Sequence, residues 1–166
     1  MADNHLGCGA MPRQAAGFTI VELMIVVAVV SVLALVALPV YLDYAVRSKV
    51  SEALVFMAEA KTSVSDAYYS NNVMPTNNTD AGLRDPNNYD TYDYIRKLEV
   101  FGVGGADSHV TQDGTIVATL KLPGTTSDSK KLMLEPVPGD GEVGWICRPH
   151  PAEGMKSNRI PGDCRN

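Results

Sequence analysis

Residues 17–41 read GFTIVELMIVVAVVSVLALVALPVY, an apolar run that contains a single carboxylate, Glu22. As a helix, the 24 residues from Phe18 to Tyr41 would rise roughly 36 Å, more than the hydrocarbon core of a bilayer, which is about 30 Å thick. An ionised side chain inside such a span costs about 2.5 kcal/mol or more and usually marks a functional partner. The stretch therefore predicts a membrane-spanning helix over residues 18–41, in which Glu22 requires a cation from another source.

Two other readings of this run are an ordinary secretory signal and a buried core helix. A secretory signal has an apolar centre of about 7 to 15 residues followed by small residues, whereas here Ala15, Ala16 and Gly17 precede a longer run. A core helix that is apolar on all sides would need a far larger protein around it. We therefore favour a membrane span, with a kink or a locally opened turn at Pro39, since an interior proline removes a helical hydrogen bond.

The chain has 166 residues and a net charge of −5. Its length leaves room for one further domain of roughly 120 residues, a common domain size. The charge and the lack of a Lys/Arg cluster in the sequence argue against a general nucleic-acid binder, which needs such cations to release counterions.

Beyond the span, apolar residues recur every three or four positions at Val46, Val50, Leu54, Met57 and Val64, which predicts an amphipathic helix over residues 42–70. The whole segment from Phe18 to about Tyr69 would form one helix that ends at Asn71-Asn72. Residues 71–93 are rich in Asn, Asp and Pro and predict a polar connecting loop.

Alternating apolar residues and turn signals predict strands at residues 94–103, 115–122, 131–136 and 142–146. Short connections such as Asp113-Gly114 favour antiparallel neighbours. We expect an α+β fold in which a four-stranded antiparallel sheet, residues 94–146, lies on the apolar face of the helix. Two alternatives remain open for the tyrosines at 89, 92 and 94: an exposed contact strip, or a cover for the edge of the sheet.

Three cysteines are present: Cys8 precedes the apolar run, whereas Cys147 and Cys164 lie close together near the other end. If the segment before Phe18 is removed, the remaining pair can form a disulfide in an oxidising compartment. The alternative is two free or metal-binding thiols beside His150. We expect a disulfide that bounds a stiff, exposed region over residues 147–166, of the kind that serves recognition.

The sequence offers little support for catalysis. His5, His109 and His150 have no accompanying nucleophile motif, and no Gly-rich phosphate loop or metal-ligand spacing is found. We predict that the protein is not an enzyme and has neither a cofactor nor a resident metal. Asn77-Asn78-Thr79 matches a glycosylation acceptor pattern, which is common by chance.

The segment from Gly17 to Met24, GFTIVELM, resembles the processing site and mature N-terminus of type IV pilins. The likeness continues through a series of residues typical of the major pilins of the type IVa group: Pro39, Tyr41, Asp43, Tyr44, Arg47, Ser48, Lys49, Val50, Ser51, Glu52, Ala53 and Leu54. It implies the pilin fold with a disulfide-closed C-terminal region. It also implies a leader peptide over residues 1–17, cleavage by a prepilin peptidase between Gly17 and Phe18, and N-methylation of Phe18.

The leader is longer than is usual in this group, and translation starting at Met11 would give a typical short leader. The turn aspartates Asp107, Asp113 and Asp140 could bind calcium, as in related secretion pseudopilins, although such residues more often form Asx turns. The start at Met11 and the role of these aspartates as turn residues are expectations from the sequence.

The resemblance implies a structural subunit of a type IV pilus, which occupies the inner membrane of a Gram-negative-type bacterium and then the extracellular filament. Its implied partners are other copies of itself in a helical homopolymer, the prepilin peptidase, the inner-membrane assembly machinery and the membrane. Adhesion to surfaces or host cells, twitching motility and DNA uptake, with contact to nucleic acid, are family activities among which the sequence does not choose. The alternative is a minor pilin or a type II secretion pseudopilin.

Cleavage would create an ammonium group at Phe18, four residues before Glu22. In a packed filament, the Glu22 carboxylate of one chain can meet the Phe18 ammonium of another, and each charge then offsets the burial cost of the other. A lone charge pair among apolar helices also selects one stagger between them, as a polar residue does in a coiled coil. We therefore assign Glu22, Phe18 and Pro39 to assembly.

Overall fold

The computed structural model describes residues 17–139 and 141–165. They fall into two compact units that divide between Leu38 and Pro39. One long helix, α1, is followed by four strands, β1 to β4, and three short 3-10 helices. The predicted α+β class is confirmed, while Cys8, His5 and Asp140 lie outside the described residues.

Helix α1 spans Ile20–Asn71, close to the predicted range. It begins there because the Thr19 hydroxyl accepts a hydrogen bond of 3.2 Å from the Glu22 backbone N–H, which is the usual N-cap contact. It ends where Asn72 takes a left-handed conformation with a φ of 58°, and the Asn72 N–H donates to the Tyr68 carbonyl at 2.7 Å. Asparagine tolerates this conformation better than most residues, so the predicted stop is confirmed.

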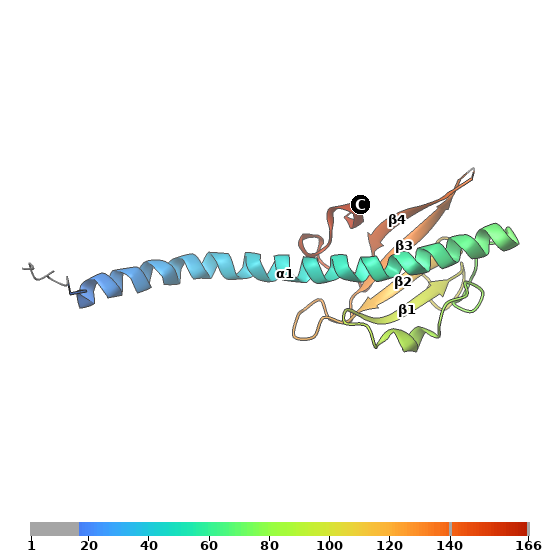
Figure 1. The fold of residues 1–166 in the computed structure, drawn as a ribbon. Coiled ribbons are helices and arrows are strands. Elements are labelled where there is room, and N and C mark those ends of the chain that lie inside the picture. Colours follow the sequence, from blue (N-terminus) through green and yellow to red (C-terminus); the bar gives the residue numbers. More distant parts are fainter. Residues whose placement is uncertain (1–16, 140, 166) are drawn as a thin grey trace, which may run out of the picture. The chain divides into compact units, whose positions relative to one another are not determined.

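The strands are β1 (Ile95–Phe101), β2 (Thr115–Leu120), β3 (Lys131–Pro138) and β4 (Val143–Pro149). They form one sheet in the order β1-β2-β3-β4, and each neighbouring pair is antiparallel. Figure 1 shows the four strands side by side along the second half of α1. Strand β4 continues beyond the predicted end at Ile146, because Arg148 and Pro149 still pair with Met133 and Leu132.

The main core lies between α1 and the sheet. The helix contributes one buried stripe at three- and four-residue spacing: Val46, Val50, Ala53, Met57, Ala60 and Val64. The sheet contributes alternate residues of its strands, among them Leu98, Ile116, Leu120, Leu132 and Leu134. Fully burying one such aliphatic side chain stabilises the fold by about 1.5 to 3 kcal/mol, so this face holds the unit together.

The centre of the outer face of the sheet is covered as well. The β1–β2 loop, residues 102–114, places Val110 against Val117 and Met133 in a second small apolar cluster. For this reason all six residues of β2 are buried. Its sequence alone, in which apolar and polar residues largely alternate, would suggest a strand with one solvent-exposed face.

The tyrosines of the connecting loop pack inward. Tyr89, in the 3-10 helix Pro86–Tyr89, is buried and stacks on Tyr92 at a ring distance of 5.8 Å. Tyr92 lies 4.9 Å from the ring of Phe56 on α1, and Tyr94 packs on the same core. Burial raises the pKa of Tyr89 despite a backbone hydrogen bond at Arg84 that lowers it. Of the two alternatives for these tyrosines, the structure supports a packed cover over an exposed contact strip.

Asn78 protects the free edge of β1. Its side-chain Nδ2 donates to the Leu98 carbonyl at 2.9 Å, and its Oδ1 accepts from the Val100 N–H at 2.7 Å. The amide therefore pairs with the outermost strand as a neighbouring strand would, and it also donates to the Arg84 carbonyl at 2.8 Å. An unpaired edge invites association with other chains, and this contact closes part of it.

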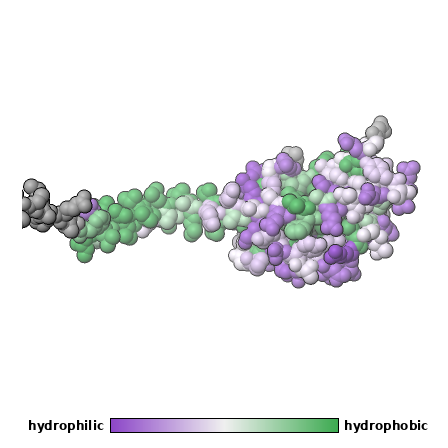
Figure 2. Space-filling view, viewed as in Figure 1, coloured by the Kyte–Doolittle hydropathy of each residue, from purple (hydrophilic) through white to green (hydrophobic). Residues whose placement is uncertain are grey.

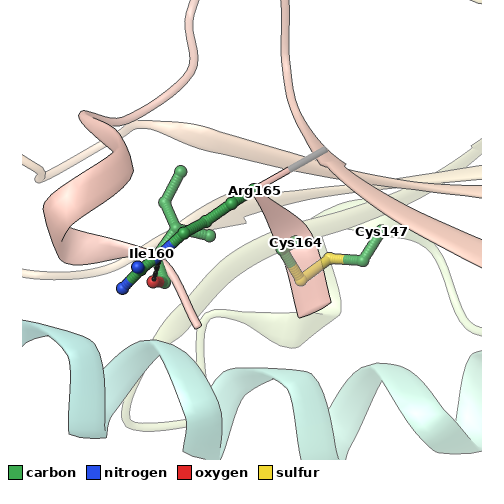
Figure 3. Close-up of a disulfide and its surroundings, with 4 residues drawn as sticks. All are labelled: Cys147, Ile160, Cys164 and Arg165. Carbon is green, nitrogen blue, oxygen red and sulfur yellow. Dashed lines mark hydrogen bonds between the residues drawn. A yellow bond between two sulfur atoms is a disulfide. The ribbon is translucent and has the colours of Figure 1, made fainter. Parts of the chain in front are cut away.

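The C-terminal lobe, residues 147–165, is fastened at both of its ends. Cys147 on β4 and Cys164 in the 3-10 helix Gly162–Cys164 form a disulfide with a Cα–Cα distance of 4.4 Å, drawn in Figure 3. The same figure shows Arg165, whose Nε donates to the Ile160 carbonyl at 3.0 Å. The disulfide is the predicted one, and it excludes free or metal-binding thiols at these two positions.

A polar contact fixes the middle of the lobe to α1. Asp43 on the helix accepts a hydrogen bond of 2.7 Å from the Arg159 Nε and another from the side chain of Asn158. Arg47, one turn further along, donates to the Asn158 carbonyl. The lobe is therefore bound covalently to the sheet and electrostatically to the helix.

We predict that Asn78→Ala lowers the free energy of unfolding by about 2 to 3 kcal/mol, because the Val100 N–H and the Leu98 carbonyl lose a buried partner. Urea denaturation of the full chain in detergent micelles measures this. Asn77→Ala is the matched control: Asn77 is exposed and its side chain bonds to the exposed Asp80, so the change should cost less than about 1 kcal/mol. Equal losses in the two variants would contradict the role given to Asn78.

We expect the double variant Cys147→Ser/Cys164→Ser to lose about 3 kcal/mol of stability, since the bond closes a loop with a sequence separation of 17 and so restricts the unfolded chain. Urea unfolding with and without a reductant makes the measurement. The reductant should destabilise the wild-type chain to the level of the variant and leave the variant unchanged. A variant as stable as the oxidised wild type would show that the disulfide contributes nothing.

Candidate functional site

The N-terminal half of α1 presents an uncovered apolar surface. Every residue from Gly17 to Leu42 is exposed. Among the described residues, α1 is the one helix long and apolar enough to cross a membrane. Figure 2 shows apolar residues following one another along this half of the helix. Soluble monomers rarely expose apolar patches beyond a few hundred Å², so this surface belongs in lipid or against other chains.

Glu22 lies in the first turn of this helix, with an exposed side chain. Its backbone N–H is capped by Thr19, so Thr19 and Glu22 occupy the Ncap and N3 positions of a T-x-x-E pattern. The positive end of the helix dipole favours a carboxylate here. This local role of Glu22 was not among the predictions from sequence, although the spacing of the two residues indicates it.

No residue in the described ranges 17–139 and 141–165 forms an ion pair with Glu22. Phe18 is exposed and lies just before the helix begins. The arrangement places an unpaired carboxylate within about one turn of the residue predicted to become the N-terminus. A second chain could therefore approach both groups.

Helix α1 continues without interruption through Pro39. The single chain therefore has no locally opened turn at Pro39. The proline ring still leaves the carbonyl of the preceding turn without its usual N–H donor. The role of Pro39 in assembly stays a prediction.

A polar cluster that the sequence did not predict lies on the other side of the sheet from α1. His150 Nε2 lies 2.9 Å from Asp107 Oδ2, and His109 Nδ1 lies 3.2 Å from Asp107 Oδ1. The His109 backbone N–H also donates to Asp107 at 3.1 Å, an Asx turn. Burial alone would raise the pKa of Asp107, but the hydrogen bonds from His109 and His150 outweigh it, so its pKa is lowered.

The ligand atoms of this cluster lie within 4.8 Å of one another, a spacing that a metal ion could bridge. The hydrogen bonds argue against one, because His150 Nδ1 accepts from the Ala152 and Glu153 backbone N–H groups at 3.2 and 3.0 Å. The ring proton must then sit on Nε2, the atom that a metal would need deprotonated. The residues present therefore fit a hydrogen-bonded pair better than a metal site.

The remaining candidates have local roles. Asp113 accepts a hydrogen bond of 2.7 Å from the Val103 N–H, and Asp107 forms the turn described above, so both act as turn residues. Asn77, the glycosylation candidate, is exposed, and its side chain donates to Asp80.

Comparison with known proteins identifies the family. A model described as pilin, a bacterial filament protein, matches residues 46–165, and a model of the prokaryotic N-terminal methylation motif matches residues 12–38. The chain is 37% identical to the type IV major pilin protein PilE1 of Neisseria gonorrhoeae over 133 residues, which are 79% of this chain and 74% of the relative. It is 34% identical to the fimbrial protein EcpC of Eikenella corrodens over 152 residues, 90% of each chain.

Both the sheet-forming unit and the apolar N-terminal segment thus match the same kind of protein. A fimbrial protein of Moraxella nonliquefaciens is 53% identical across 49 residues, 30% of this chain and 32% of the relative. The chain belongs to the type IV pilins, and it is a structural protein rather than an enzyme.

Proposed function

We propose that this chain is a repeating structural subunit of a type IV pilus. A prepilin peptidase cuts it between Gly17 and Phe18 and methylates the new terminus. The mature chain resides in the inner membrane of a Gram-negative-type bacterium, and the assembly machinery there adds it to an extracellular filament. The observation that carries this proposal is the fully exposed apolar surface of residues 18–42, which lipid covers before assembly and other subunits cover afterwards.

Glu22 sets the stagger between subunits in this proposal. Once cleavage has freed the Phe18 amino group, a neighbouring chain can offer that cation to the Glu22 carboxylate. The surrounding side chains are apolar, so the pair would form in a medium where an unpaired charge is costly. The uncut precursor has no ammonium at Phe18, and processing therefore comes before assembly.

Two features favour a major subunit over a minor pilin or a secretion pseudopilin. The relatives that match most of the chain are named as major pilins and fimbrial proteins. The C-terminal lobe is closed by a disulfide. The lobe and the connecting loop are the surfaces available for contacts with host cells or other surfaces. The requirement that adhesion, twitching motility and DNA uptake share is a retractable fibre, and the fibre is what we propose.

We predict that Glu22→Ala leaves cleavage and membrane insertion intact but reduces surface filaments by more than tenfold. Losing one member of a buried pair costs about 3 to 5 kcal/mol, which exceeds a hundredfold in an equilibrium constant. Filaments sheared from cells are quantified against the membrane pool of processed protein. Glu59→Ala, which removes an exposed carboxylate from the second half of α1, is the matched control and should assemble normally. Abundant filaments in Glu22→Ala cells would refute the registry role.

A major subunit should dominate the fibre. We expect gel electrophoresis of sheared filaments to show a single main band, and mass spectrometry of that band to give a chain that begins at N-methylated Phe18. The same measurement on precursor from peptidase-deficient cells distinguishes a start at Met1 from a start at Met11. A normal fibre that lacks this chain as its main component would support the minor-pilin alternative.

A further inference from the structure

The hydrogen bonds of His150 define the state of its ring. The side chain is almost fully buried, with 3% of its area exposed. Nδ1 accepts two backbone hydrogen bonds, from Ala152 and Glu153, and Nε2 faces the Asp107 carboxylate at 2.9 Å. A nitrogen that accepts carries no hydrogen, so the ring is neutral and donates from Nε2.

These contacts close a tight turn, residues 150–154, at the start of the C-terminal lobe. A Cβ added to Gly154 would meet the His150 carbonyl and come within 2.9 Å of the Pro149 Cβ, so only glycine fits there. The Glu153 carbonyl accepts from the Lys131 N–H at 2.8 Å, and the Lys131 and Glu153 side chains form an ion pair. The turn is therefore held to β3 as well as to the imidazole.

We propose that His150 is a proton-operated switch of the C-terminal lobe: the neutral ring keeps the turn 150–154 closed, and the protonated ring opens it. A protonated imidazole carries hydrogens on both nitrogens. The hydrogen on Nδ1 would point at two backbone N–H groups, and donors cannot bond to one another. The contact between Nε2 and Asp107 becomes an ion pair on protonation and keeps the ring in place. The turn, rather than the ring, has to move.

Charges around the ring come from several elements. The groups that face it or line the same hollow, of about 470 Å³, are Asp107 and His109 of the β1–β2 loop, Glu99 of β1, Lys131 of β3 and Glu153 of the turn. Lys131 and Glu153 pair with each other, and Glu99 pairs with Lys97. The Asp107 carboxylate favours a positive ring, whereas the two N–H donors oppose it only while the turn is closed. Protonation and opening are therefore coupled.

The switch would change an exposed surface. Pro151, Ala152 and Glu153 are all exposed, and imidazole is the side chain that changes its charge between pH 5 and 8. The lobe would present a closed turn in neutral surroundings and an open one in acidic surroundings. This inference does not depend on which pilus activity the protein serves.

Nuclear magnetic resonance of the isotope-labelled full chain in detergent micelles, titrated from pH 8 to pH 5, tests the proposal. At pH 8 we expect the ring nitrogens of His150 to show the Nε2–H tautomer. On acidification, the Ala152 and Glu153 amide signals should shift with the same midpoint as the ring. Their protection from hydrogen exchange, corrected for the intrinsic effect of pH, should fall at least tenfold.

Three variants separate the switch from a general effect of acid. In His150→Asn, the side-chain oxygen can accept the same two N–H groups as an Asx turn but does not titrate, so the turn should stay closed at both pH values. His109→Gln removes the neighbouring imidazole and should leave the response intact. Gly154→Ala should open the turn already at pH 8.

Three results would each overturn the proposal. The Ala152 and Glu153 amides could remain protected while the His150 ring titrates, which would uncouple the two events. The acid response could persist in His150→Asn, which would place its origin elsewhere. Micromolar Zn²⁺ could shift the Nε2 signal at pH 8, which would show a metal site instead of a hydrogen-bonded switch.

Discussion

The structure depends on one helix having to satisfy two environments. The second half of α1 carries a single apolar stripe, which the sheet buries. The first half is apolar on all sides and exposed from Gly17 to Leu42. A stretch of this kind is stable only in lipid or among similar helices, because water solvates it poorly. Residence in lipid or packing among other subunits follows from that constraint, and we propose that Glu22 provides the polar contact that makes the packing specific.

The second compact unit, which begins at Pro39, is stabilised by contacts that suit a small domain with an exposed surface. Asn78 pairs with the backbone of the edge strand β1, the β1–β2 loop covers the centre of the outer face of the sheet, and the disulfide closes the C-terminal lobe. Each device removes an open edge or restricts a loop at a place where association could otherwise occur out of register. A subunit that must polymerise through its helix gains from a sheet that does not pair with other chains.

Much of the fold could be predicted because its signals are local. The apolar run and the spacing of Val46, Val50 and Met57 indicated the helix and its buried face, and alternating residues indicated the four strands. The end of β4 could not be predicted in this way, since its last residues are in the strand only because β3 lies opposite them. The tyrosines were ambiguous for a similar reason: Tyr92, on which Tyr89 stacks, meets Phe56 of α1 only because the fold brings the connecting loop to the helix.

The sequence by itself determined the membrane-spanning helix, the α+β class, the cysteine pair and the position of Glu22, because periodicity and spacing along the chain carry that information. The tertiary structure alone decided which distant polar groups meet. Asp107 reaches His150 across 43 residues, and Asp43 reaches Arg159 across 116. Neither pair belongs to a motif, since hydrogen bonds between remote residues depend on where loops close over a packed core. The contact between Asp107 and His150, on which the proposed switch rests, could therefore be recognised only in the folded chain.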